Sequence, residues 1–94
     1  MKVNLKIFLP MLSDAIGHKE LEVEFPGSTV NDLINHLIDV YGRKVEDALL
    51  DENGEFDPVI QILLNGEEWI PIDQLDMELN NGDSVVILMM MAGG

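Results

Sequence analysis

The sequence contains no cysteine, so disulfides, thiolate metal sites and cysteine nucleophiles are excluded. It also contains no Lys or Arg after position 44, whereas residues 45–94 hold twelve acidic side chains. The whole chain of 94 residues has a formal net charge of −13. Such a chain repels phosphate backbones, which argues against nucleic-acid binding. The acidity serves either solubility or the steering of a basic partner, and the sequence leaves both open.

Long apolar runs are absent as well. No segment approaches the ~18–20 apolar residues of a membrane span, and residues 1–6 alternate instead of forming the apolar stretch of a secretory signal. We therefore expect a soluble cytoplasmic protein that does not engage a membrane. With 94 residues, of which 47% are hydrophobic, the chain suits one folded domain and not a disordered acidic tail.

The first strands are indicated by alternation. Residues 3–9 carry an apolar side chain at every odd position, and residues 19–25 do so from position 21 onward. A period of two is typical of strands with one buried face. Residues 10–18 are interpreted as the connection, with Gly17 as its turn residue. These segments predict an antiparallel hairpin.

The strongest local pattern is a helix over residues 30–41. Thr29 can act as the N-cap, Asp32 can complete a weak capping box, and Gly42 stands where a C-terminal cap belongs. The spacing of apolar residues places them on a single stripe of the helix. The stripe consists of Val30, Leu33, Ile34, Leu37 and Ile38.

The remaining patterns complete a mixed α+β domain. Residues 43–50 predict a short second helix. Residues 59–64 predict a strand, Asn65-Gly66 a two-residue hairpin turn, and residues 67–70 and 84–90 further strands. A single main helix covers one sheet face, and the helical crossover allows the first and last strands to pair in parallel. This is the β-grasp, or ubiquitin-like, layout, spanning residues 1–94 with 91–94 as a flexible tail.

No catalytic constellation is apparent. His18 is expected in a turn and His36 on the polar face of the helix, where solvated side chains are the ordinary outcome. Asp51, Asn53 and Glu55 faintly resemble a calcium loop, but the later bidentate Glu is missing. We therefore expect a protein that is not an enzyme and that binds no metal or cofactor itself.

The unusual element is the end of the chain. Gly93 and Gly94 follow a strand of apolar or small residues, and they carry no side chains that would block a narrow channel. A terminal carboxylate on such an arm can enter an active site and be activated as an acyl adenylate. The alternative to such a reactive arm is an ordinary frayed terminus without a function.

Several segments together resemble the MoaD/ThiS family of ubiquitin-like sulfur carriers, in particular the small subunit of molybdopterin synthase. The resemblance covers nearly the whole chain, and it departs at Ser13-Asp14, where the family usually has Arg-Glu, and at the Met-rich residues 89–92. The matching segments are residues 12–23, 26–33, 64–67 (Leu-Asn-Gly-Glu), 79–85 (Leu-Asn-Asn-Gly-Asp-Ser-Val) and 93–94.

The resemblance implies a mechanism. A partner related to ubiquitin-activating enzymes uses ATP to adenylate Gly94, a sulfur donor converts the adenylate to a thiocarboxylate, and the large synthase subunit uses that sulfur to build the dithiolene of molybdopterin. Any ATP or zinc would belong to the activating partner. Gly93, which has no side chain, would let the tail pass through a narrow channel of that partner. A carrier for thiamin thiazole synthesis, a protein modifier conjugated through Gly94 and a plain binding module remain open.

Alternation also predicts an outer face of the sheet that the helix does not cover. Clustered apolar residues on such a face point to a partner surface, and the resemblance favours this reading for Phe8 and Leu88. The alternative is that residues 43–58 fold over the face and bury it. The expected partner-binding residues are Phe8, Leu63, Leu88, Met90 and Met91.

Overall fold

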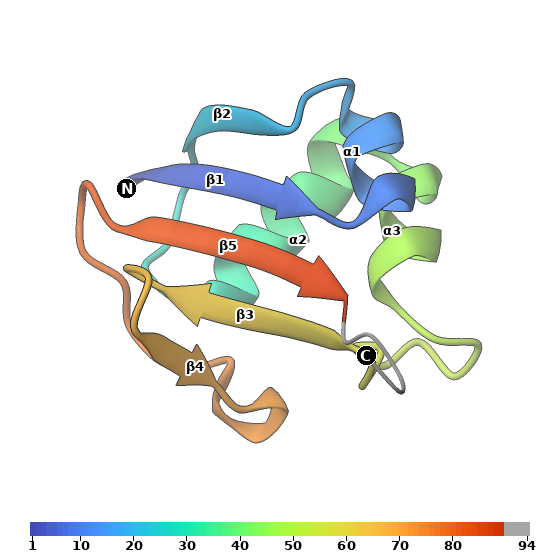
Figure 1. The fold of residues 1–94 in the computed structure, drawn as a ribbon. Helices are drawn as coiled ribbons and strands as arrows, with labels where there is room; N and C mark the ends of the chain where they lie inside the picture. Colours follow the sequence, from blue (N-terminus) through green and yellow to red (C-terminus); the bar gives the residue numbers. More distant parts are fainter. Residues whose placement is uncertain (90–94) are drawn as a thin grey trace.

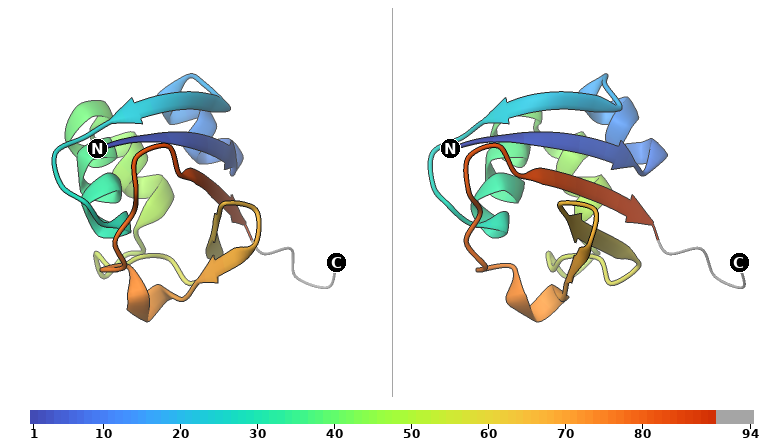
Figure 2. Two further views of the ribbon diagram at one scale, coloured as in Figure 1. Left: turned by 90° about the vertical axis from the view of Figure 1, so that its left-hand side faces the viewer. Right: turned by 60° about the vertical axis from the view of Figure 1, so that its left-hand side comes forward.

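A computed structural model describes residues 1–89 of the chain, which form a five-stranded sheet with helices packed on one side (Figure 1). Figure 2 shows this two-layer arrangement from the side, with the short 3-10 turn η1 beyond β4. In chain order the elements are β1 (Lys2–Phe8), α1 (Pro10–Ile16), β2 (Glu20–Glu24), α2 (Val30–Tyr41), α3 (Arg43–Leu49), β3 (Ile60–Leu64), β4 (Glu68–Ile70), η1 (Ile72–Gln74) and β5 (Ser84–Met89).

The strand order is β2-β1-β5-β3-β4. The two central strands, β1 and β5, run parallel, with Leu5 opposite Val85 and Phe8 opposite Leu88. The other neighbours pair antiparallel. The prediction of a β-grasp domain with parallel first and last strands is therefore confirmed. It follows that the C-terminal end of β5 emerges beside the end of β1.

The N-terminus of α2 is held by the predicted capping box. The Thr29 hydroxyl accepts a hydrogen bond from the Asp32 amide at 3.0 Å, and the Asp32 carboxylate accepts from the amides of Ser28 at 2.9 Å and Thr29 at 3.1 Å. These hydrogen bonds lower the pKa of Asp32 below its ordinary value, and the bond from the Ser28 amide contributes most. Gly27 is required here because an added Cβ would lie 2.6 Å from the Asp32 carboxylate, and because its φ is +122°.

The core lies between the sheet and the helices. Val30, Leu33, Ile34 and Leu37 of the predicted stripe are buried, and Ile38 is half-buried. From the sheet, the predicted facing residues are also buried; they are Leu5, Ile7, Val23 and Ile87. In α3 the predicted inward residues Val45, Ala48 and Leu49 are buried too.

We expect Leu37→Ala to lower the free energy of unfolding by about 2–5 kcal/mol, because Leu37 is 0% exposed and its loss leaves a cavity under the sheet. The measurement is equilibrium unfolding in denaturant. Val40→Ala on the same helix is the matched control: Val40 is 57% exposed, so its truncation should change stability by less than about 0.5 kcal/mol. Equal losses in the two variants would contradict the burial of the stripe.

The structure corrects two local predictions. Residues 10–18 are not merely a connection, because Pro10–Ile16 form α1, with Pro10 in its first turn and Gly17 as a left-handed C-cap at φ 87°. The β3–β4 turn is one residue longer than predicted. Leu64 pairs with Glu68, so Glu67 joins Asn65 and Gly66 in the turn.

Within residues 1–89, none of the helices is long and apolar enough to cross a membrane. The tail predicted at residues 91–94 lies outside the described residues and stays a prediction.

Candidate functional site

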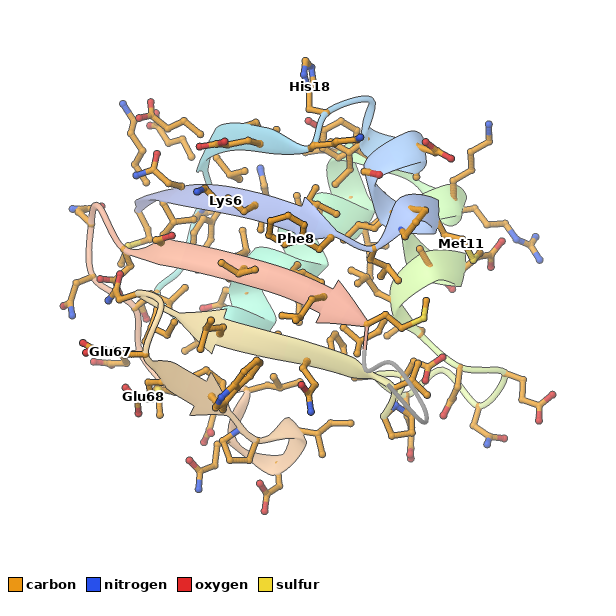
Figure 3. The ribbon with its side chains drawn as sticks, viewed as in Figure 1. Lys6, Phe8, Met11, His18, Glu67 and Glu68 are labelled. Carbon is orange, nitrogen blue, oxygen red and sulfur yellow. The ribbon has the colours of Figure 1, made fainter. Side chains whose placement is uncertain are left out.

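The outer side of the sheet carries the candidate site. Directly paired residues of neighbouring strands point to the same side, so the register shows which side chains meet. Phe8 of β1 pairs with Leu88 of β5, and Leu88 pairs with Gln61 of β3. Figure 3 shows Phe8 on the side of the sheet away from the helices. The structure thus brings Phe8 and Leu88 together as predicted.

A second row crosses the sheet beside the first. Val86 of β5 pairs with Leu63 of β3, which pairs in turn with Trp69 of β4. We call the combined surface the apolar sheet face. It consists of Phe8, Leu63, Trp69, Val86 and Leu88.

Val86 and Trp69 were not predicted as partner-binding residues, although the sequence held a signal for Val86. Val86 has the same parity as Leu88 in the last strand. Trp69 lies in the strand predicted at residues 67–70, and hairpin pairing places it next to Leu63. The predicted two-residue turn, however, would have paired Trp69 with the buried Ile62, so only the longer turn seen in the structure places Trp69 on this face.

The apolar sheet face is exposed. Phe8 is 65% and Trp69 53% exposed, and the other three residues are half-buried. The alternative that residues 43–58 cover this face is wrong, because the face is exposed, α3 packs against α1 and α2, and the loop after α3 lines a cleft together with α2. Exposed aromatic side chains grouped with aliphatic ones are typical of protein interaction surfaces.

The last described residue, Met89, lies directly after Leu88, so the described part of the chain ends at one margin of the apolar sheet face. A partner that covers this face would therefore stand next to the start of the C-terminal segment. The predicted residues Met90, Met91, Gly93 and Gly94 lie outside the described residues, and their roles stay predictions.

Charged groups flank the face on its β2 side. Lys6 is exposed beside Phe8 on β1 (Figure 3). The Lys2 ammonium lies 3.5 Å from the Glu22 carboxylate, and Glu20 and Glu24 are exposed on the same strand as Glu22. Both partners of the ion pair are more than half exposed, so the pair adds little stability. The face is thus an apolar centre with a charged margin, as in many protein interfaces.

The residues considered for catalysis or metal binding are dispersed. His18 is exposed in the turn before β2 (Figure 3), and His36 lies with its ring centroid 6.2 Å from that of Phe25. The Asp51 carboxylate accepts hydrogen bonds from the amides of Asn53 and Glu55, so it organises its own loop. Over residues 1–89, no three His, Asp or Glu side chains gather as a metal site would require.

Comparisons with known proteins find similarity along nearly the whole chain. The model of the ThiS family matches residues 9–94. A protein of Archaeoglobus fulgidus named as a sulfur carrier is 34% identical over 90 residues, covering 96% of this chain and 98% of its own length. Small archaeal modifier protein 3 of Haloferax volcanii is 29% identical over the full length of both chains.

A solved structure of a related protein has the same fold. The Pyrococcus furiosus protein described as subunit 1 of a molybdopterin converting factor superposes with a TM-score of 0.72. It is 28% identical and covers 97% of this chain and 99% of its own.

Proposed function

The chain belongs to the ThiS family of small ubiquitin-like sulfur carriers, and on that premise we propose that it carries sulfur as a thiocarboxylate on Gly94 for the synthesis of molybdopterin. The observation that carries this proposal is the exposed apolar sheet face at the margin where β5 leads into the C-terminal segment. A partner docked on this face stands beside the residues that it must process.

The chemistry proceeds in two steps at the terminal carboxylate. A carboxylate oxygen attacks the α-phosphorus of ATP in the activating partner, forming an acyl adenylate and releasing pyrophosphate. Sulfide from the donor then attacks the carbonyl carbon, a C–S bond forms, and the C–O bond to AMP breaks. The chain supplies the carboxylate and the docking surface, whereas the partner supplies ATP and the catalytic groups. This chain needs no cofactor or catalytic site of its own.

The large subunit of molybdopterin synthase is the proposed acceptor. The similarity to the Pyrococcus furiosus protein favours this pathway over thiamin thiazole synthesis. Reconstitution tests it: the thiocarboxylated chain and the large subunit should together convert the sulfur-free pterin precursor to molybdopterin. If the loaded chain instead supports only thiazole formation with the thiamin enzymes, the pathway is wrong while the carrier role stands.

Protein modification is the second candidate, and the similarity to Small archaeal modifier protein 3 favours it. Both functions begin with the same adenylate, so peptide mass spectrometry of cell extracts separates them. A carrier yields a C-terminal peptide in which one oxygen is replaced by sulfur. A modifier yields branched peptides in which Gly94 is joined to a lysine of another protein.

The net charge of −12 over residues 45–94 gives a prediction for partner association. We expect the association rate with the activating enzyme to fall as salt rises, because at ~0.15 M ionic strength screening limits steering to about 8 Å. Stopped-flow measurements across a salt series test this. A rate that does not change with salt would mean that the acidity serves solubility alone.

A further inference from the structure

A cleft of about 480 Å³ opens between α2, the loop after α3 and the segment around η1. Its volume falls within the ~300–1,000 Å³ that is usual for binding pockets. None of its lining residues belongs to the apolar sheet face, so the cleft is a separate surface. It is lined by apolar residues, by the amides of Asn31 and Asn35, and by the acids Glu55 and Asp73.

The inner walls of the cleft are apolar. Ile34 of α2 is buried, and Leu50, Phe56 and Leu75 are half-buried. These four residues come from three different segments of the chain, so the fold itself assembles the cleft. Apolar walls of this kind favour the burial of the hydrocarbon part of a ligand.

The two carboxylates belong to different walls of the cleft. Glu55 comes from the loop after α3 and Asp73 from η1, and both residues are exposed. Among the described residues, the ion pairs are Lys2–Glu22 and Arg43–Asp47, so neither carboxylate has a cationic partner. The cleft therefore combines apolar walls with uncompensated negative charge.

The wider charge distribution has the same sign. Both acids lie in residues 45–94, which contain no Lys or Arg. A second copy of this chain is a poor occupant, because two molecules of net charge −13 repel each other. The complementary occupant carries a cation on an aliphatic stem, as Arg and Lys side chains do.

We propose that the cleft receives an Arg or Lys side chain from a basic segment of a partner protein. The aliphatic stem packs on Phe56 and Leu75, and the cationic head lies between Glu55 and Asp73. Because this surface is distinct from the apolar sheet face, a partner can occupy both at once or the two surfaces can serve different partners. The proposal does not depend on the chemistry at Gly94.

The test uses the full-length chain, isotope-labelled, and the capped peptide acetyl-Ala-Arg-Leu-Arg-Ala-amide as probe, followed by amide NMR titration. We expect shifts at α2, at residues 50–56 and at residues 72–75. The double variant Glu55→Gln/Asp73→Asn should weaken binding about tenfold, as the loss of two exposed ion pairs predicts. Glu67→Gln/Glu68→Gln removes the same charge at the β3–β4 turn (Figure 3), away from the cleft, and should change affinity less than about twofold.

Four outcomes would overturn the proposal. The first is an equal loss of affinity in both double variants, because that indicates attraction to net charge alone. The second is a shift pattern centred on the apolar sheet face. The third is equally tight binding of a probe in which citrulline, which is neutral, replaces each arginine. The fourth is self-association: a sedimentation coefficient that rises with protein concentration in the absence of the probe, but not in Glu55→Gln/Asp73→Asn. That result would assign the cleft to a second copy of this chain.

Discussion

Deleting Gly94 is expected to abolish sulfur loading. The deletion moves the reacting carboxylate back by one residue, which is ~3.3 Å in an extended chain. An active site built for in-line attack tolerates little displacement, since a shift of ~1 Å can cost about a hundredfold in rate. The measurement is a reconstituted reaction with activating enzyme, ATP and sulfide, in which intact mass reports the replacement of oxygen by sulfur.

Controls separate a displaced carboxylate from a damaged protein. Gly93→Ala adds a methyl group where backbone must pass close to the partner, so it should slow loading without abolishing it. A chain with one extra C-terminal glycine displaces the carboxylate in the opposite direction and should also fail. All three variants should keep the wild-type unfolding midpoint, because they leave the core formed by residues 1–89 unchanged. Loading of the chain without Gly94 at the wild-type rate would refute the proposed function.

Much of the fold could be predicted because its patterns are local. Alternation identified β1 and β2, and the apolar stripe between Thr29 and Gly42 identified α2. Each of these elements buries a single face, so its period is visible in the sequence. The parallel pairing of β1 with β5 followed from one helical crossover between them.

Helix α1 was missed because it is short and its buried face includes the polar Ser13, whereas the equally short α3 was predicted from three apolar residues at helical spacing. Its seven residues make about two turns, so its buried face shows only Leu12, Ser13 and Ile16. The signals were nevertheless present: Pro10 suits the first turn of a helix, and Gly17 suits the left-handed cap after its end. Such a pattern is too brief to separate from a loop until packing against α3 is known.

The two surfaces differ in how far the sequence could reveal them. The apolar sheet face follows from strand parity and pairing, so Phe8, Leu63 and Leu88 could be placed on one side in advance. The cleft could not, because its walls come from three separate segments, including an irregular one. No sequence period connects Ile34 with Phe56 or Asp73, and only the tertiary fold brings them together.

Replacing Phe8 is expected to disrupt partner binding with little effect on folding. Phe8 is 65% exposed and pairs with Leu88 next to the end of β5, so we expect it to act as an aromatic anchor for a partner. Truncation of such an anchor typically costs about 2 kcal/mol or more of binding free energy, which is about thirtyfold in Kd. Phe8→Asp should cost more, because a carboxylate would be desolvated without a partner.

The measurement is calorimetric titration of the activating enzyme with wild-type, Phe8→Ala and Val40→Ala chains. Val40 is also exposed, but it lies on α2 in the layer behind the sheet, so its truncation should leave Kd within about twofold. Trp69→Ala tests the far side of the same face and should weaken binding, since Trp69 continues the row through Leu63. If Phe8→Ala and Val40→Ala bind alike while both remain folded, the apolar sheet face does not dock the activating enzyme. In that case the contact must be sought elsewhere, and the loading defect expected without Gly94 would still stand, because it depends on the reach of the carboxylate and not on this surface.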